Sequence, residues 1–473
     1  MAIVGSKDNP LRVAVIGCGP SGFYVAQTLL TQKDLAVTVD MLDRLPSPYG
    51  LVRYGVAPDH QKMKAVTKVY AKIASDRAVR WFGSVEFGKH VTLDELKARY
   101  HAVAFTTGAQ TDRRLGIPGE DLVGSHPATE FVAWYNGHPD YRHLTFDLGT
   151  ERAVVIGVGN VAIDVARMLC RTPEELAKTD IADYALETLR KSRVKEVLLV
   201  GRRGPAQAAF TNSEVEELED MEGADAVTLP EEMALDDVSR EELAAHPDRL
   251  VESKVAQLNK YALPHASARA KRLVIRFLLS PTEIRGENGR VTGIRLVRNA
   301  LTRGKDGSVK ATATDRFEDV PTGLVFRSVG YRGVALPGVP VRDDWGTIPH
   351  EQGRVTDLAT KQPVPGLYAA GWIKRGPSGV IGTNRGCAVE TVRAMLEDLR
   401  AGSIPSPQDP SRDALPALLE RKGVRWISFD QWSKVESMEV ARGEPSGRPR
   451  VKFVSEDEIL RAIASGTPAP AAS

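Results

Sequence analysis

Cysteine is scarce in this sequence. Only Cys18, Cys170 and Cys387 occur among 473 residues, and no two of them have CxxC spacing. A cysteine-rich zinc site, a cysteine-ligated iron–sulfur cluster and a dithiol redox pair within the chain are therefore excluded, and we expect no metal site. Because structural disulfides are rare in reducing compartments, so few cysteines predict a cytoplasmic protein.

Long apolar runs and a strong charge imbalance are also missing. No stretch approaches the roughly 20 apolar residues that a transmembrane helix needs, so no membrane partner is expected. The formal net charge is only +2, which argues against a dedicated nucleic-acid binder. A content of 42% hydrophobic and 26% charged residues is ordinary for a globular protein. The length leaves room for about two to four domains.

A strand–turn–helix–strand unit lies near the start of the chain. Residues 12–17 (RVAVIG) form a short apolar run that is typical of a buried parallel strand. Gly17, Gly19 and Gly22 follow it as G-x-G-x-x-G, which permits a tight turn, close approach of a pyrophosphate and close helix–strand packing. Asp43 ends the next strand about 20 residues later, where a carboxylate binds a ribose hydroxyl. This pattern predicts a dinucleotide site, commonly for FAD at this position.

A second unit of this kind lies in the middle of the chain, but its second strand ends in different residues. Gly157, Gly159 and Ala162 form G-x-G-x-x-A, and the following strand ends in Arg202 and Arg203. Two guanidinium groups bind a 2′-phosphate through charge-assisted hydrogen bonds, whereas a carboxylate would repel it. The pattern therefore predicts NADP(H) over NAD(H). The spacing of about 40 residues is longer than in the simple motif, so two arginines that only cap a strand remain an alternative.

Two dinucleotide sites on one chain predict hydride transfer between a nicotinamide and a flavin. Elsewhere, residues 102–109 are expected to form another buried strand. Residues 214–247 look helical and acidic, and strands are expected in the segments that follow residue 273.

Five segments carry a resemblance to a known family. In order along the chain they are GCGPSGFY at 17–24, DRLPSPYGLVRYGVAPDH at 43–60, GVGNVAIDVAR at 157–167, GRRGPAQAAFTNSEVEEL at 201–218 and GWIKRGPSGVIGTN at 371–384. Together they closely resemble the adrenodoxin-reductase-like ferredoxin–NADP reductases, especially the actinobacterial enzymes. The resemblance extends from about residue 12 to residue 452.

The resemblance implies an α/β fold with two doubly wound dinucleotide-binding domains of the glutathione-reductase-like type. The NADP domain is inserted into the FAD domain. The implied boundaries are 1–109 for the first part of the FAD domain, 110–338 for the NADP domain, and 339–473 for the second part of the FAD domain with a C-terminal tail.

The resemblance also implies roles for particular residues. Those expected at FAD are Ser21, Asp43, Leu51, Phe87, Trp372, Gly379, Val380 and Ile381. Those expected at NADP are Val158, Gly159, Asn160, Val161, Arg202, Arg203 and Glu214, with Gly379 near the nicotinamide. His60 and Glu217 are expected beside the flavin, where His60 has a secondary, orienting role. Asp43 stands where many relatives have Glu, and Phe87 where Val is usual. Taken alone, Trp372 reads equally well as a core residue, and His60 as an ordinary hydrogen-bonded histidine.

The expected reaction is hydride transfer from NADPH to FAD, followed by transfer of single electrons to a ferredoxin-type iron–sulfur protein, with cytochrome P450 systems as one downstream use. The chain has too few cysteines to carry the cluster, so this partner is a separate protein, bound transiently. Such partners are typically acidic. The candidates for a basic docking face are Arg269, Lys271, Arg272 and Arg276, and the alternative is a solvated charged surface.

Other functions remain open at this point. A disulfide reductase of the thioredoxin-reductase kind requires a thiol pair that the sequence lacks. A flavin monooxygenase has a fingerprint that is not found between the two glycine motifs. An electron-input subunit of a larger complex, as in glutamate synthase, usually carries N-terminal cluster-binding cysteines. A nucleotide sensor without activity has no use for two redox cofactors.

Overall fold

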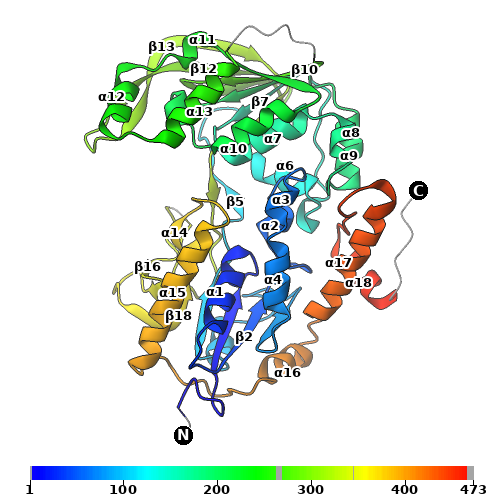
Figure 1. Cartoon of the computed structure of the whole chain (residues 1–473), viewed down its shortest axis with the longest axis vertical. Coiled ribbons are helices and arrows are strands. Elements are labelled where there is room, and N and C mark those ends of the chain that lie inside the picture. Colours follow the sequence, from blue (N-terminus) through cyan, green and yellow to red (C-terminus); the bar gives the residue numbers. More distant parts are fainter. Residues whose placement is uncertain (1–2, 263–268, 345, 466–473) are drawn as a thin grey trace.

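The computed structural model describes residues 3–262, 269–344 and 346–465 and shows two domains stacked along the long axis (Figure 1). One contains strands from both halves of the chain, and we call it the terminal domain. The other contains the strands between residues 125 and 327, and we call it the inserted domain. The expected tail at 466–473 lies outside the described residues.

The terminal domain is built on a seven-stranded sheet. Its order is β16 (His350–Glu351), β17 (Arg354–Thr356), β18 (Pro363–Ala369), β4 (Ala102–Phe105), β1 (Leu11–Ile16), β2 (Val37–Leu42) and β3 (Val79–Phe82). The strands from β18 to β3 pair in parallel, while β16 and β17 form an antiparallel edge. All six residues of β1 are buried, as expected for a central parallel strand covered on both faces.

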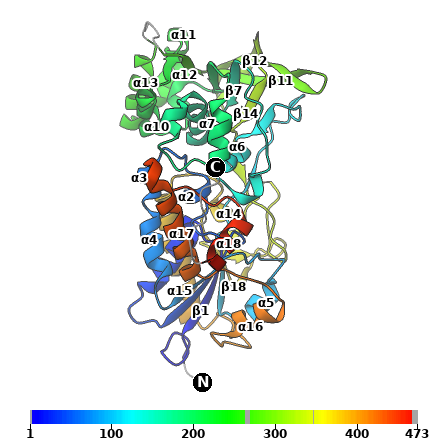
Figure 2. The same ribbon diagram turned by 90° about the vertical axis from the view of Figure 1, so that its right-hand side faces the viewer.

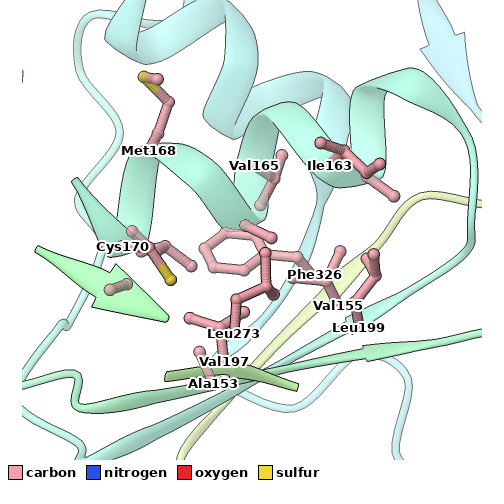
Figure 3. Close-up of a cluster of buried hydrophobic side chains, with 14 of the residues drawn as sticks. Ala153, Val155, Ile163, Val165, Met168, Cys170, Val197, Leu199, Leu273 and Phe326 are labelled. Carbon is pink, nitrogen blue, oxygen red and sulfur yellow. The ribbon is translucent and has the colours of Figure 1, made fainter. Parts of the chain in front are cut away.

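The inserted domain is built on a six-stranded parallel sheet. Its order is β6 (Ser125–Pro127), β14 (Leu324–Arg327), β7 (Arg152–Ile156), β8 (Glu196–Val200), β10 (Lys271–Arg276) and β9 (Ala224–Thr228). Figure 3 shows how Ile163 and Val165 of the crossover helix pack with Val155, Leu199 and Phe326 of the sheet. Branched and aromatic side chains on the sheet therefore form the core that holds the second glycine turn in place.

An antiparallel layer is added to this domain by β11 (Leu279–Glu287), β12 (Arg290–Arg303) and β13 (Val309–Pro321). The helical expectation for 214–247 is confirmed for most of the segment, which contains helices at Pro230–Met233 and Asp237–Ala245. It is wrong for β9, which lies within the segment and pairs with β10. Its residues are alternately buried and half-buried, which is the period of a strand. The acidic residues on either side of this short strand obscured that period in the sequence.

Helices cover both sheets (Figure 2). In the terminal domain they are α1 (Pro20–Leu30), α2 (Leu51–Tyr54), α3 (Gln61–Lys64), α4 (Thr67–Ala74), α5 (Leu93–Lys97), α14 (Trp372–Arg375), α15 (Thr383–Arg400) and α16 (Ala414–Arg421). In the inserted domain they are α6 (Ala128–Tyr135), α7 (Asn160–Cys170), α8 (Pro173–Leu176), α9 (Asp183–Arg190), α10 (Asn212–Glu216), α11 (Pro230–Met233), α12 (Asp237–Ala245) and α13 (Arg249–Lys260). Within the described ranges, no helix has the length and apolar character needed to cross a bilayer.

The two connections between the domains run side by side. β5 (Thr111–Asp112) leads into the inserted domain, and β15 (Tyr331–Arg332) returns from it as the antiparallel partner of β5. Further hydrogen bonds join Gln110 N–H to the Arg332 carbonyl at 3.1 Å and Arg113 N–H to the Gly330 carbonyl at 2.9 Å. This ribbon lies near the expected boundary at 109/110, while the boundary at 338/339 stays a prediction.

A C-terminal arm packs along both domains. It comprises α17 (Phe429–Gly443) and α18 (Glu456–Ser465), which lie beside α4 and below α8 and α9 in Figure 1. Trp432 of α17 is fully buried against the terminal domain. Arg448, in the loop after α17, donates to the Thr179 carbonyl at 2.9 Å and also bonds the Ile181 carbonyl. The arm therefore fixes the inserted domain from a second side.

Phe326→Ala tests the core of the inserted domain. Phe326 is fully buried, and its loss leaves a cavity, so we expect the free energy of unfolding to fall by about 3–5 kcal/mol. Urea unfolding measures the change. Phe317→Ala, at a side chain that is 51% exposed, is the matched control and is expected to change it by less than about 1 kcal/mol. Equal losses in both variants would contradict this assignment of the core.

Candidate functional site at the domain interface

A cavity of about 1630 Å³ lies where the two domains meet. Both glycine turns open onto it, and so do the ends of β1, β2, β7 and β8. The carboxyl ends of parallel strands are where open α/β sheets bind their ligands. The carboxyl ends of the strands of both sheets therefore face the same cavity.

The first glycine turn forms an open cradle. Gly17 has φ +97°, and a Cβ there would lie 2.8 Å from Thr107 Cα. Helix α1 begins at Pro20 without a side-chain cap, and a Cβ at Gly19 would meet no described atom closer than 3.9 Å. The backbone N–H groups of the first helical turn are thus free to bind an anion, and the turn fits a pyrophosphate. Gly22 does not line the cavity. It packs against the backbone of the turn instead, where a Cβ would lie 2.3 Å from the Gly17 carbonyl oxygen.

Asp43 is fixed at the end of β2, beside this cradle. Its carboxylate accepts hydrogen bonds from Cys18 N–H at 2.7 Å and Leu45 N–H at 3.0 Å. Burial raises the pKa of Asp43, although these two hydrogen bonds oppose the rise. The carboxylate lines the cavity, which is the placement that a ribose-binding acid requires.

The other residues expected at FAD gather on the same side of the cavity. Trp372 begins α14, donates from Nε1 to the Ser378 carbonyl at 3.1 Å, and packs beside Tyr331 with ring centroids 5.4 Å apart. The Ser21 hydroxyl donates to Asn384 Oδ1 at 2.9 Å, which joins α1 to α15. The remaining members that line this wall are Leu51, Phe87, Gly379, Val380 and Ile381.

The second glycine turn repeats the first. Gly157 has φ +130°, and a Cβ there would lie 2.1 Å from the Ser328 carbonyl oxygen. Around Gly159 a Cβ would meet no described atom within 4 Å, and α7 begins at Asn160 without a side-chain cap. Val158 and Val161 line the cavity as well, whereas Ala162 is buried in the domain core. This cradle therefore also suits a pyrophosphate.

Arg202 and Arg203 follow β8 on the cavity wall. Among the described residues, neither guanidinium donates a hydrogen bond or forms an ion pair, although the Arg202 carbonyl accepts one from Asn299 Nδ2 at 2.8 Å. Burial, and then the charge of Arg202, lower the pKa of Arg203. Two adjacent cations without a bound partner fit a phosphate monoester, the group that distinguishes NADP from NAD.

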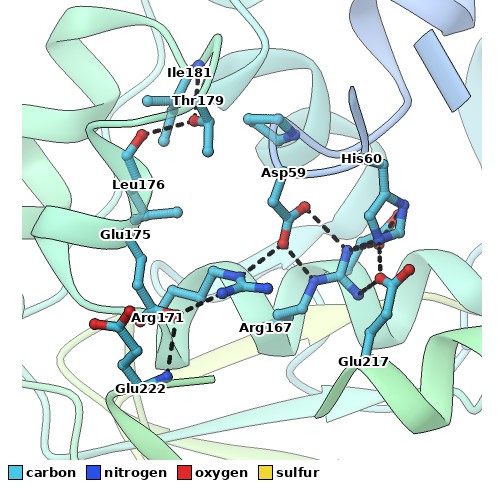
Figure 4. Close-up of polar contacts among 12 residues, drawn as sticks. Asp59, His60, Arg167, Arg171, Glu175, Leu176, Thr179, Ile181, Glu217 and Glu222 are labelled. Carbon is cyan, nitrogen blue, oxygen red and sulfur yellow. Dashed lines mark hydrogen bonds and ion pairs between the residues drawn. The ribbon is translucent and has the colours of Figure 1, made fainter. Parts of the chain in front are cut away.

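A buried arginine organises the polar residues between the domains (Figure 4). Arg167 of α7 is completely buried and donates to Asp59 at 2.6 and 3.1 Å, to Asp164 at 2.6 Å and to Glu214 at 3.1 Å. Its Nη2 also lies 2.6 Å from His60 Nε2. Asp59 and His60 belong to the terminal domain, so this one guanidinium connects the two domains beside the cavity.

His60 and Glu217 form a second bond between the domains. His60 Nε2 lies 2.6 Å from Glu217 Oε2, and only His60 of the pair lines the cavity. Burial acts to lower the pKa of His60, but the hydrogen bond to Glu217 and the charges of Asp164 and Glu214 together outweigh it, and the pKa is raised. The same hydrogen bond lowers the pKa of Glu217. The contact therefore favours the charged form of each partner.

The carboxyl groups around Arg167 differ in acidity. Burial and the neighbouring Asp164 raise the pKa of Glu214 to about 7. Burial acts to raise the pKa of Asp59 as well, but Arg167 and Arg171 outweigh it and lower that pKa to about 2. Neighbouring carboxyl groups thus differ in proton affinity, and Glu214 is able to take up a proton near neutral pH.

The same cluster has the donor set of a metal site. Possible ligand atoms of His60, Asp164 and Glu214 lie within 4.8 Å of one another. The Arg167 guanidinium is already within hydrogen-bonding distance of all three residues. A positively charged side chain of the protein, Arg167, therefore already lies beside these acids.

Sequence reasoning did not select Arg167, Asp59 or Asp164. All three lie in segments that carry the family resemblance, and two signals were available. Asp164 and Arg167 are three residues apart, on one face of a helix that starts at a glycine turn. Asp59 directly precedes His60. The sequence gives no sign that the segment of Asp59 approaches that of Asp164 and Arg167 across the domain interface.

Comparison with known proteins decides the family. Residues 11–219 match the family model for pyridine nucleotide-disulphide oxidoreductases. NADPH-ferredoxin reductase FprA of Mycobacterium tuberculosis is 46% identical over 461 residues, which is 96% of this chain and 99% of that protein. This chain belongs to the NADPH–ferredoxin reductase family. Human mitochondrial NADPH:adrenodoxin oxidoreductase is 42% identical to this reductase. The match covers 97% of this chain and 93% of the human protein. A solved structure of M. tuberculosis FprA in complex with NADPH superposes with a TM-score of 0.90 at 45% identity, covering 96% of this chain and 100% of that one.

These comparisons confirm the resemblance and the two-domain α/β fold, and they make the protein an oxidoreductase. They do not favour a subunit of the glutamate-synthase kind, because the match spans almost the full length of FprA. All three cysteines are free and buried, and no two of them are paired. The contacts of individual residues with cofactors stay predictions.

Glu214→Gln tests the raised pKa of Glu214. A folded-state pKa of about 7, above the ordinary 4.5, stabilises the fold at low pH, and this contribution is lost as pH rises from about 4.5 to about 7. Gln mimics the protonated acid at every pH. The melting temperature of the variant, relative to the wild type, is therefore expected to rise between pH 5 and pH 8. Glu216→Gln, at an exposed side chain of the same helix, is the control. A difference that does not change with pH would contradict the assignment.

Proposed function

We propose that this reductase oxidises NADPH at a bound FAD and delivers single electrons to a separate ferredoxin-type iron–sulfur protein. The observation that carries this proposal is the shared cavity. Two uncapped glycine turns open into it from different domains, and an arginine pair without a bound partner stands beside only one of them. The names of the relatives, NADPH-ferredoxin reductase and NADPH:adrenodoxin oxidoreductase, support the same reaction.

Each domain contributes the residues that bind one of the two cofactors. The turn at Gly17–Gly19 and the first turn of α1 bind the FAD pyrophosphate, and Asp43 binds its ribose. The turn at Gly157–Gly159 binds the NADP pyrophosphate, while Arg202 and Arg203 bind the 2′-phosphate. Bound FAD supplies chemistry that side chains lack, because it accepts a hydride and releases electrons one at a time. The protein contributes position and electrostatics.

His60 and Glu217 act as positioning residues at the meeting point of the domains. Their hydrogen bond holds the His60 ring at the cavity wall. Hydride transfer needs no proton from the protein, so the role of the pair is to orient the residues that hold the nicotinamide and flavin rings. Arg167 Nη2 contacts the same ring nitrogen of His60 and helps to fix it.

The setting of the reaction is also proposed. The reductase works in the cytoplasm, where its three free cysteines stay reduced. Contact with the iron–sulfur protein is transient, because a carrier of electrons must leave after each transfer. Neither the modest net charge nor the lack of long apolar runs in the sequence calls for a nucleic-acid or membrane partner.

Replacement of Arg202 and Arg203 by Gln tests the nucleotide assignment. NADPH is expected to bleach the visible flavin absorbance of the wild type rapidly, and NADH slowly. Loss of two charge-assisted hydrogen bonds is expected to raise KM for NADPH by about tenfold to several hundredfold, with little change for NADH. Arg316→Gln, at an exposed position in β13, is the control. Colourless protein, or an unchanged preference in the double variant, would contradict the proposal.

The cations of the basic run at 269–276, the candidate docking face, are engaged in contacts within the inserted domain. Lys271 donates to the Leu169 carbonyl at 2.8 Å, and Arg276 is buried in ion pairs with Glu232 and Glu318. Arg269 donates to a backbone carbonyl, and the exposed Arg272 pairs with Glu196. These cations are already bound within the inserted domain.

A different surface fits an acidic partner better. Helix α1 has no charged residue, and it packs between α15 on one side and α4 on the other. The exposed cations on α4, α15 and the neighbouring α3 are Lys62, Lys68, Lys72, Arg385, Arg393 and Arg400. None of the six has an ion pair or side-chain hydrogen bond within the described residues. Helix α15 begins next to the Gly379–Ile381 turn, so a partner bound here lies close to the flavin end of the cavity.

Charge reversal tests this docking surface. The variant with Arg385→Glu and Arg393→Glu is expected to raise KM for ferredoxin about tenfold at low ionic strength and to reduce its salt dependence. Reduction of ferricyanide by NADPH, which needs no docking, is expected to stay unchanged. The matched control reverses Arg269 and Arg272 to Glu. An equal effect in the control pair would place docking elsewhere.

A further inference from the structure

A second cavity of about 210 Å³ lies behind α3, away from the glycine turns. Five cationic side chains line it, and Asp180 is the one carboxylate among its lining residues. The cations are Arg53, Lys64, Lys68, Arg450 and Lys452. Three parts of the chain meet here, because Lys64 comes from the terminal domain, Asp180 from the inserted domain and Lys452 from the C-terminal arm.

Two buried lysines share that single carboxylate. Lys64 Nζ lies 2.6 Å from Asp180 Oδ1, and Lys452 Nζ lies 3.2 Å from Asp180 Oδ2. The other partners of these two ammonium groups are neutral oxygen atoms. Asn136 supplies its side-chain oxygen to both, at 3.4 Å each, and its carbonyl to Lys452 at 3.1 Å. One positive charge is therefore left over in a buried place.

The remaining cations do not remove this excess. Arg53 is balanced by Glu439 through bonds of 2.6 and 2.8 Å, and Arg450 is balanced by Glu436 at 2.9 Å. Lys68 adds a further charge at an exposed position. Burial lowers the pKa of both Lys64 and Lys452, although Asp180 opposes the change. A buried charge that lacks a counter-ion is costly, and either loss of its proton or uptake of an anion removes that cost.

We propose that this cavity binds a phosphate-type oxyanion, which bridges the terminal domain, the inserted domain and the C-terminal arm. The cavity has room for a tetrahedral anion, and several N–H donors on its wall match the oxygen atoms of such a group. Lys64, Lys68 and Lys452 bind it, and Arg450 borders it. None of its five cationic side chains lines the cavity of the glycine turns. Lys68 also belongs to the proposed docking surface, but phosphate binding is measured separately from the reaction.

Inorganic phosphate is the probe for this site. Titrations use the FAD-bound protein saturated with NADP⁺, so that the 2′-phosphate site is already filled, and potassium chloride keeps the ionic strength constant. Calorimetry gives the affinity, and the melting temperature reports stabilisation. Phosphate is expected to bind with one site per chain and to raise the melting temperature, because a ligand bound only to the native state stabilises it.

Lys452→Met is the main variant. It removes the excess charge and leaves the Lys64–Asp180 pair neutral, and phosphate affinity is expected to fall by about tenfold or more. Lys68→Met, at an exposed side chain that is safe for folding, is expected to weaken phosphate binding about two- to fivefold. The matched control is Lys310→Met on β13, whose side chain is 56% exposed, and its affinity is expected to equal that of the wild type.

The outcomes separate the possibilities. Phosphate binding that weakens in Lys452→Met and Lys68→Met but not in Lys310→Met supports the site. If Lys452→Met does not fold, the comparison of Lys68→Met with Lys310→Met decides. No phosphate binding beyond the effect of chloride, or equal binding in all variants, overturns the proposal. Glycerol 3-phosphate, tested in the same way, distinguishes the sources of the anion: tighter binding than phosphate indicates a phosphomonoester, and weaker binding indicates the free ion.

Discussion

The relation between the two domains depends on one buried guanidinium. Arg167 is completely excluded from solvent and donates hydrogen bonds to Asp59, Asp164 and Glu214 at once, with His60 in contact. Burying so many ionised groups is costly unless each is paired, so the cluster is stable only when both domains contribute their part. Because Asp59 and His60 come from one domain and the rest from the other, correct charge pairing requires the correct relative placement of the two binding turns.

The chemistry proposed for this fold relies on placement more than on reactive side chains. Each glycine turn directs free backbone N–H groups at the same cavity, and each is supported by a buried parallel strand and the helix that follows it. Hydride transfer requires two rings at contact distance and few other groups. A large fraction of the chain therefore serves to hold the two glycine turns at a fixed separation. The shared polar cluster lies between the domains, where an error in that separation would most change the distance between the two rings.

Much of the fold and the cofactor sites was predictable because their signals are local. Gly17 and Gly157 have positive φ, a conformation that favours glycine, and the run before Gly17 has the composition of a buried strand. Other features depend on distant partners. Strand β9 exists because the edge of β10 is available to pair with it, and no pattern within its five residues reveals that edge. The basic run at 269–276 is less available for docking than its sequence suggests, because Lys271 and Arg276 lie in β10, an inner strand, where side chains turn into the packed layers on either side. Arg167 was missed because three of its four partners, all but Asp164, come close to it only in three dimensions.

The paired crossing of β5 and β15 has a mechanical consequence. Since both covalent links pass through one narrow ribbon, the inserted domain is free of any second tether that would have to stretch or unfold for it to turn. Several non-covalent contacts oppose a swivel about the ribbon axis, among them those of Arg167, the bond between His60 and Glu217 and those of the C-terminal arm. Such contacts break and reform without changing the topology of either sheet, so this architecture permits one domain to rotate against the other while each keeps its own shape.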